Sequence, residues 1–409
     1  MNVINRGRFL IGAFSGIAVV ASTDHLFARA LADAPLPGLP GGEDRVLVLV
    51  NLQGGNDGLN CIVPHGNAQY YQQRPTLAVP QSEVLAIDQR IGFNPTMRSM
   101  NALYDKGQVA VVQGVGYPNP DHSHFRSTEI WQTAAPATYE HTGWLGRYLD
   151  DANLPSDNLF NGIALAQVLP EALISSKVDV PAVAQLGGYG LISDRNRYAR
   201  ATYGELVRDN RFPFTSPYLA HIAEVEDDAQ RGSEELPQLV AGYKTDAAYP
   251  ATPLGRSLAL AAQIVGSRTG TRVLYVQHGS YDTHVSQKGT QDRLLGELSD
   301  ATKAFYDDLA AHGNDKRVLM MTFSEFGRRN AENGSNGTDH GEASPLFLIG
   351  GGVKGGVYGS YPDLAENNMG NLRFSTDFRS VYATVLERWL GRPSQKILAG
   401  EFPTIAALG

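Results

Sequence analysis

The chain has 409 residues but only one cysteine, Cys61. A single cysteine excludes a disulfide framework and any zinc site built from several thiolates. We expect this thiol to be buried rather than reactive. Basic residues are also scarce, because 34 Lys and Arg stand against 42 Asp and Glu, and the formal net charge is −8. Phosphate binding along a nucleic acid needs clustered Lys and Arg, so the composition predicts no nucleic-acid partner.

The sequence also lacks an apolar run of about 20 residues, the length that a comfortable membrane span requires. The apolar run FLIGAFSGIAVVAS (9–22) is shorter and follows Arg6 and Arg8. A short basic region, an apolar core and small residues beyond it predict an export signal over 1–32. The route stays open between twin-arginine export, general secretion and an uncleaved anchor. We therefore expect a periplasmic or extracellular protein with no stable membrane span once the signal is removed.

The folded part is expected to span 44–409, after a flexible Pro- and Gly-rich leader at 33–43. Short runs rich in Val, Ile and Leu predict strands buried on both faces at 45–52, 108–115, 162–169, 272–279, 317–324 and 345–351. Helical spacing with start and stop signals lies between them at 94–107, 252–268 and 291–313. This alternation predicts a doubly wound α/β domain, in which helices sandwich a mostly parallel sheet. The segment 180–250 differs in composition and predicts a helical insertion.

Polar residues gather at the ends of the predicted strands, where open α/β sheets bind their ligands. The residues concerned are Asp57, Ser123, Arg126, Asp282, His284, Arg328, Asp339 and His340. Carboxylate and imidazole groups suit zinc, manganese or another divalent ion. A bound metal can activate a serine hydroxyl or a water molecule. The pattern therefore indicates metal-assisted hydrolysis, with Arg126 or Arg328 as a bidentate clamp on phosphate or sulfate oxygens.

Each of these residues also has an ordinary structural interpretation. Asp57 lies in GGNDG, a composition typical of turns. Ser123 is a common type of helix N-cap residue. Two further pairs could be simple ion pairs, namely Asp282 with His284 and Glu325 with Arg328. From the residues alone, both sets of interpretations stay open.

Five segments taken together resemble one large bacterial family: GGNDGLN, HSHFRSTEIW, YDTH, FSEFGR and TDHGEASPLFLIGGGVKGG. It is an uncharacterised domain-of-unknown-function family of exported proteins that typically carry twin-arginine signals, placed in the alkaline phosphatase–sulfatase superfamily. The resemblance covers roughly 1–60, 90–150 and 270–390. It implies an alkaline-phosphatase-like fold and one or two divalent ions such as zinc, manganese or calcium. It also implies a small-molecule or polysaccharide-linked anionic ester as the substrate.

The resemblance assigns a nucleophilic role, with a metal contact, to Ser123. It assigns metal ligation to Asp57, Asp282, His284, Asp339 and His340. The chain departs from the superfamily pattern in three ways. The spacing Asp282-x-His284 replaces the usual Asp-x-x-x-His, no histidine follows His340, and the Cys-x-Pro/Ala-x-Arg sulfatase signature is absent. His124 is a candidate for the missing ligand.

The function implied is an exported, metal-dependent hydrolase of phosphate or sulfate esters. The alternative from another class is a non-catalytic exported binding or assembly protein that keeps the fold and a structural metal. A serine hydrolase of carboxyl esters is disfavoured, because the chain has no Gly-x-Ser-x-Gly nucleophile elbow. Phosphomutase activity is disfavoured by the expected export.

Overall fold

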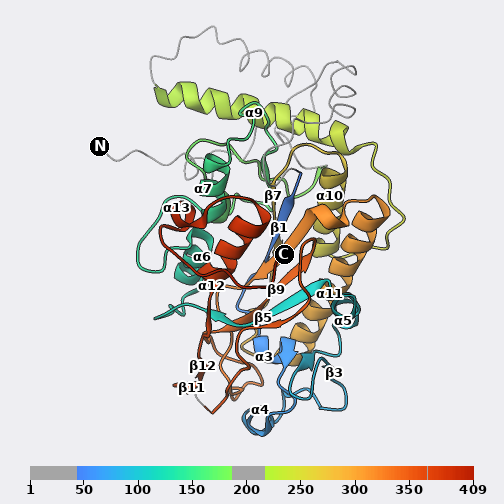
Figure 1. Cartoon of the computed structure of the whole chain (residues 1–409), viewed down its shortest axis with the longest axis vertical. Coiled ribbons are helices and arrows are strands. Elements are labelled where there is room, and N and C mark those ends of the chain that lie inside the picture. Colours follow the sequence, from blue (N-terminus) through green and yellow to red (C-terminus); the bar gives the residue numbers. More distant parts are fainter. Residues whose placement is uncertain (1–43, 187–216, 366) are drawn as a thin grey trace.

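The structure, a computed structural model, describes residues 44–186, 217–365 and 367–409 (Figure 1). The expected export signal (1–32), the leader (33–43) and part of the expected insertion (187–216) lie outside these residues. Within the described part of the chain, no helix is both long and apolar enough to cross a membrane. The domain boundaries expected from the sequence stay predictions.

The centre of the molecule is an eight-stranded sheet in the order β10-β5-β9-β8-β1-β7-β6, with β13 paired to β5. Its strands are β1 Val46–Leu52, β5 Val109–Gly116, β6 Gly162–Leu165, β7 Val273–His278, β8 Val318–Phe323, β9 Ser344–Gly350, β10 Gly356–Tyr358 and β13 Thr376–Asp377. Only β9 runs antiparallel to its neighbours, and every other pair in this sheet is parallel. All six predicted strands are present, although β6 is shorter than expected, and the prediction of a mostly parallel α/β sheet is confirmed.

Helices cover both faces of the sheet, as the sequence of β1 requires. All seven residues of VLVLVNL in β1 are buried. Val46, Val48 and Val50 pack in the core on one face, while Leu47 and Leu49 pack in the core on the other. The first face is covered by α5 Arg98–Asp105, α10 Pro253–Gly266 and α11 Gln287–Ala311. The second is covered by α6 His124–Thr133, α7 Trp144–Asp151, α12 Phe378–Thr384 and α13 Ser394–Leu398.

The predicted helices form close to their expected positions, and α10 has a side-chain cap at its start. The Thr252 hydroxyl caps α10 by accepting a hydrogen bond from the Gly255 N–H at 3.1 Å. Helix α11 begins at Gln287, four residues before its expected start. In the expected insertion, the described helix is α9 Pro217–Val240.

The remaining elements are short. They are α3 Gly58–Cys61, β2 Ile62–Val63, α4 Ala68–Gln73, β3 Leu85–Ala86, β4 Gly92–Phe93, β11 Asn367–Asn368 and β12 Asn371–Leu372, the 3-10 turns η1 Glu171–Leu173 and η3 Asp315–Arg317, and a π-helical turn η4 Val385–Trp389. Helix α9 lies at one end of the molecule, and α4 with the small β2-β4-β3 sheet lies at the other (Figure 1). Cys61 is buried, and its burial raises the pKa of the thiol to about 12, as expected for an unreactive residue.

The antiparallel direction of β9 decides where the polar loops meet. Its first residue lies at the edge of the sheet where β1, β5 and β8 end, so the loop that precedes it joins the loops that follow those strands. The turn after β1 also packs directly on the loop after β7. A β-carbon at Gly54, whose φ is +118°, would overlap the backbone nitrogen of Asp282, so only glycine permits this approach.

Candidate metal centre

Three side chains from two loops converge at this edge of the sheet. The Asp282 Oδ1 lies 3.0 Å from His284 Nε2 and 3.3 Å from His340 Nε2. The two imidazole nitrogens are 3.0 Å apart. Tetrahedral zinc with metal–nitrogen bonds of about 2.0–2.1 Å places neighbouring ligand atoms about 3.3 Å apart. The spacing of the three atoms therefore fits a single metal ion.

His124, the first residue of α6, extends the cluster. Its Nε2 is 3.5 Å from Asp282 Oδ2, and His124, Asp282 and His340 together form a group able to hold a metal. The other ring nitrogen, Nδ1, lies 2.9 Å from the buried Glu325 carboxylate, which only accepts hydrogen bonds. In the neutral ring the proton therefore sits on Nδ1, and Nε2 carries a lone pair, although the hydrogen bond to Glu325 also raises the pKa of His124. This Nε2 is buried without a hydrogen-bond partner, which a bound cation would explain.

His340 and His284 are oriented in the same way. The Nδ1 of His340 donates to the His122 carbonyl oxygen at 2.8 Å, which leaves its Nε2 free to face the cluster. The Nδ1 of His284 lies 3.4 Å from Asp339 Oδ1. Histidines that bind metals usually donate their second ring N–H to a carbonyl or carboxylate in this manner. The chemistry of the donor set therefore fits a divalent ion.

Asp339 contacts Nδ1 of His284, the ring nitrogen that does not face Asp282. Its Oδ1 accepts a hydrogen bond from the Asn333 side chain at 3.1 Å, and its side chain is 52% exposed. The hydrogen bond from Asn333 is the main cause that holds the pKa of Asp339 below its usual range, with His284 contributing. The sequence predicted Asp339 as a direct ligand, and the arrangement favours a place behind His284. Direct ligation by Asp339 stays a prediction.

Arg328 keeps Asp282 ionised. Burial alone would raise the pKa of Asp282, but the Arg328 guanidinium, 2.7 Å away, lowers it to about 2 with help from His340 and His284. This buried guanidinium also contacts the backbone carbonyls of Gly54, Gly55, Tyr281 and Thr338, and its Nη1 lies 3.5 Å from His284 Nε2. The ion pair that the sequence suggested between Glu325 and Arg328 is not the pairing found, because Arg328 pairs with Asp282 and Glu325 pairs with His124.

The charges around the imidazoles are not balanced within the protein. Three carboxylates and one guanidinium contact the cluster, namely Asp282, Glu325, Asp339 and Arg328. When the imidazoles are neutral, their formal charges sum to −2, which one divalent ion cancels. Uncompensated charge of this kind is costly in a partly buried site.

Neither arginine is placed as an anion clamp. Arg328 is engaged as described. Arg126 donates to the carbonyls of Ala135, Pro136 and Thr138 and lies 3.0 Å from the Glu129 carboxylate. Its guanidinium also lies over the Tyr139 ring, 4.1 Å from the centroid. Both groups bind within the protein, so the geometry does not favour the role that the sequence predicted for them.

Asp57 lies apart from the cluster and has its own cation. Its carboxylate is 2.6 Å from the Arg74 guanidinium, and both side chains are 0% exposed. A metal ion bound at this neutral pair would leave a formal charge of +2, so the pair does not fit a second metal. The other oxygen, Oδ1, is buried without a hydrogen-bond partner. Metal binding by Asp57 stays a prediction that its surroundings do not favour.

Ser123 is the N-cap residue of α6 but does not act as a cap. Its hydroxyl makes no capping hydrogen bond, and the side chain is exposed. Its backbone N–H donates to Asp121 Oδ1 at 2.6 Å, which fixes the turn that presents it. Ser123 is thus next to His124 at the site. Its nucleophilic role stays a prediction.

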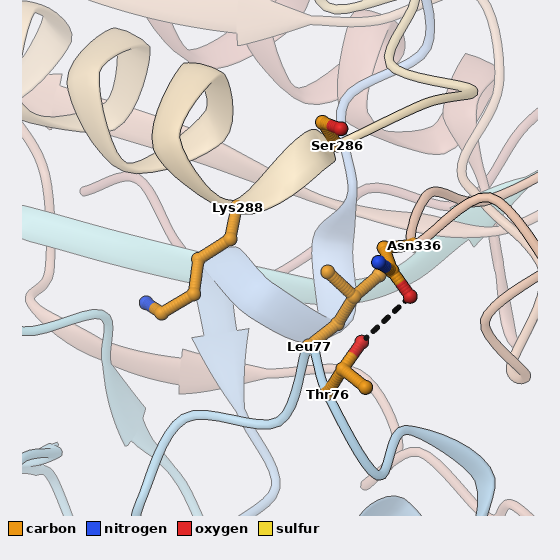
Figure 2. A pocket seen from close by; sticks show the side chains of 5 residues that line it. All are labelled: Thr76, Leu77, Ser286, Lys288 and Asn336. Atoms are coloured by element: carbon orange, nitrogen blue, oxygen red, sulfur yellow. Dashed lines mark hydrogen bonds between the residues drawn. The ribbon is translucent and has the colours of Figure 1, made fainter.

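A separate pocket of about 280 Å³ lies beside the start of α11 (Figure 2). It is lined by Thr76, Leu77, Ser286, Lys288 and Asn336. The Thr76 hydroxyl donates to Asn336 Oδ1 across it at 3.5 Å. None of the predicted site residues lines this pocket, so it does not contain the candidate metal centre.

Among the solved structures that match this chain, three examples show how weak the similarity is. The C-terminal periplasmic domain of EcEptC from Escherichia coli, in complex with Zn, is 10% identical over 78% of this chain and 77% of that one, with a TM-score of 0.36. A protein in the alkaline phosphatase superfamily from Vibrio parahaemolyticus is 10% identical over 82% and 71%, with a TM-score of 0.33. The lipoteichoic acid synthase LtaP from Listeria monocytogenes is 7% identical over 81% and 73%, with a TM-score of 0.38. At these values the structures do not bear on the site or its activity.

The sequence comparisons are more decisive about the family than about the function. No curated protein matches the chain. Residues 44–394 match the family described as "Protein of unknown function (DUF1501)". This match spans nearly the whole described chain and confirms the predicted domain-of-unknown-function family. The chain belongs to the DUF1501 family.

Proposed function

We propose that the chain is an exported metal-dependent hydrolase of phosphate or sulfate esters. Its metal would be held by Asp282, His284 and His340, with His124 as a fourth ligand. The observation that carries this proposal is the convergence of His124, Asp282 and His340 as a group able to hold a metal, with His284 Nε2 3.0 Å from Asp282 Oδ1. The contacting charged groups have a formal charge of −2 when the imidazoles are neutral. The buried and unpartnered Nε2 of His124 supports it independently.

Ser123 would be the nucleophile. A divalent ion at the cluster would supply Lewis acidity toward an ester oxygen and toward a nearby hydroxyl. The Ser123 oxygen would bond to phosphorus or sulfur as the bond to the ester oxygen breaks, and the alcohol would leave with a proton. Water would then hydrolyse the modified serine, release phosphate or sulfate and restore the hydroxyl. The N-terminus of α6, where Ser123 lies, favours an anionic group.

The substrate would be an anionic ester on a small molecule or a polysaccharide outside the cytoplasm. This part of the proposal rests on the export signal expected over 1–32 and on the chemistry of the cluster. Zinc, manganese and calcium were all expected from the sequence. The three imidazoles favour zinc or manganese over calcium, because calcium prefers oxygen ligands.

The second candidate is a non-catalytic exported binding or assembly protein with a structural metal. The engagement of Arg126 and Arg328 within the protein favours it, because neither guanidinium is presented to an anion. Under this proposal the cluster would stabilise the loops at the sheet edge, and Ser123 would have no chemical role.

The Ser123→Ala variant separates the two candidates. We expect the metal-loaded wild-type chain to hydrolyse an aryl phosphate or an aryl sulfate, and Ser123→Ala to lose this turnover while keeping its metal and its melting temperature. Thr128→Ala, on the same helix but outside the cluster, is the control and should stay active. Equal turnover in Ser123→Ala would remove the nucleophile assignment. A wild-type chain that binds metal tightly but cleaves neither ester class would favour the binding protein.

A further inference from the structure

Gln287 joins the two loops that carry the proposed ligands. It is the first residue of α11 and is fully buried. Its Oε1 accepts a hydrogen bond from the Thr338 hydroxyl at 2.6 Å and another from the Thr283 hydroxyl at 3.1 Å. Thr283 lies between Asp282 and His284, and Thr338 lies two residues before His340. One amide oxygen therefore joins the two loops, beside the direct hydrogen bond from the Thr338 N–H to the Thr283 carbonyl at 3.2 Å.

Asp57 fixes the orientation of this amide. The Nε2 of Gln287 donates to Asp57 Oδ2. Because a carboxylate only accepts hydrogen bonds, the amide nitrogen must face Asp57 and the amide oxygen must face the two threonines. An inverted amide would place Oε1 against the Asp57 carboxylate, where neither oxygen has a hydrogen to donate.

Arg74 in turn holds Asp57. Its guanidinium donates to Asp57 Oδ2 at 2.6 Å and to Asn60 Oδ1 at 2.9 Å. Its other N–H groups donate to the carbonyls of Arg329 and Asn330, both at 2.8 Å. Arg74 therefore ties the turn after β1 to the same long loop that leads to His340. The ion pair is an internal anchor and needs no bound cation.

We propose that Gln287 is a positioning residue for the metal centre and that the Asp57–Arg74 ion pair is its anchor. This inference rests on the proposed metal centre. The network holds Asp282, His284 and His340 at ligand spacing before a metal arrives, which reduces the reorganisation that binding requires. Arg74 supplies the positive charge at Asp57, so Asp57 is not a ligand and the chain binds one metal ion.

Gln291 offers a matched control for Gln287. It is also fully buried, one turn further along α11. Its amide nitrogen donates to Asn56 Oδ1 at 2.9 Å and lies 3.3 Å from the Asp57 carbonyl. It thus contacts the same turn as Gln287 but neither ligand-bearing loop. Replacing either glutamine by methionine keeps the side-chain length and removes the hydrogen bonds.

Zinc affinity is measured by competition with a chromophoric chelator, on the full chain stripped of metal. We expect Gln287→Met to weaken zinc binding about 10- to 100-fold, the usual cost of losing a group that orients a ligand. Gln291→Met should lower the melting temperature in a similar way but leave zinc affinity close to that of the wild type, because Gln291 contacts neither ligand-bearing loop. Equal zinc affinities in the two variants would overturn the proposal for Gln287.

Asp57→Asn tests the anchor. We expect one metal ion per chain in both the wild type and Asp57→Asn, and the same visible absorption spectrum when cobalt replaces zinc. A lost equivalent of metal or an altered cobalt spectrum would instead make Asp57 a ligand, through its buried and unpartnered Oδ1.

The absence of a metal centre can be distinguished from the failure of the positioning role of Gln287. If the wild-type chain binds no zinc or cobalt, the proposed function fails, and the network is tested by amide hydrogen exchange on the metal-free protein. Gln287→Met should then accelerate exchange at 282–284 and 338–340, and Gln291→Met should not. Exchange that is the same in the two variants would overturn the positioning role without reference to metal.

Discussion

Two aspartates in polar loops at one edge of the sheet, Asp57 after β1 and Asp282 after β7, end in opposite surroundings. Asp57 is 0% exposed and forms an ion pair with Arg74. Among the described residues, Arg74 forms an ion pair with no other carboxylate. Asp282 is 47% exposed and faces three imidazoles. Its arginine, Arg328, is outnumbered by the carboxylates around the cluster. The first aspartate is neutralised by the fold, and the second lies where one divalent ion would restore neutrality.

The difference shows that a motif does not determine the charge of its site. Both aspartates lie in loops that the resemblance associates with metal ligation. The cation that neutralises Asp57 is Arg74, which lies 17 residues later in the sequence, at the end of α4. A buried ion pair of this kind is costly to break from one side only, because the remaining partner is left uncompensated.

Removing a ligand should have the largest effect. We expect His340→Ala to lose nearly all its metal, falling from about one ion per chain to a trace amount by plasma mass spectrometry, because the remaining ligands no longer enclose the ion. His312→Ala is the control, since His312 packs on Tyr243 and not on the cluster. Full metal content in His340→Ala would show that the cluster is not the site.

Breaking the ion pair between Asp57 and Arg74 should mainly lower the stability of the fold. We expect Arg74→Met to lower the free energy of unfolding by about 3–5 kcal/mol, because it leaves the Asp57 carboxylate buried and unpaired. The measurement is urea unfolding with a chelator present in every sample. The double variant Asp57→Asn/Arg74→Met should recover part of the loss, since no charge is then left unpaired. A loss below about 1 kcal/mol would place the pair among weak surface ion pairs.

The sheet was predictable from sequence because a strand buried on both faces needs continuous aliphatic residues, and VLVLVNL or VLMMTF satisfy that requirement locally. The site was predictable in part. Asp282, His284 and His340 stood at strand ends, and the structure brings them together. Glu325 was noticed only as a partner for Arg328, although it is the group that orients His124.

The sequence could not show which charged groups would pair with one another in the folded protein. Arg74 lies in QQRPT, which carries no motif, and its approach to Asp57 depends on how α4 packs on the turn after β1. Arg328 looked like a substrate clamp because its position was right, but the backbone carbonyls that engage it belong to three separate loops. Contacts of this kind are set by tertiary packing and leave no local pattern.

Removing a charge behind a ligand should have a moderate effect. In Glu325→Gln the amide oxygen can still accept from the Gly54 N–H and from His124 Nδ1, both of which bind Oε1 of Glu325. The variant therefore removes the charge and keeps the shape. We expect zinc affinity to fall about 10- to 100-fold in a chelator competition, as for other groups that orient metal-bound histidines. An unchanged affinity would mean that His124 does not bind the metal.

The smallest expected effect concerns the open side of the cluster. Phe125 follows His124 and is 90% exposed, so it makes little contribution to the core. If Asp282 and its imidazoles form an open catalytic site, the exposed ring that follows His124 in the chain is a candidate contact for the organic part of the substrate. We expect Phe125→Ala to raise KM about two- to tenfold, in keeping with the roughly 0.5–1.5 kcal/mol of a ring contact, and to leave kcat and metal content unchanged.

The control for Phe125 is Val357→Ala, at an exposed apolar position on the edge strand β10. Steady-state kinetics on the same ester should show no change in either constant for this variant. A fall in kcat for Phe125→Ala would mean that the ring positions His124 instead of the substrate, because only an interaction made in the transition state changes kcat. The site at Asp282 would then depend on a packing contact of Phe125, just as Asp57 depends on its ion pair with Arg74.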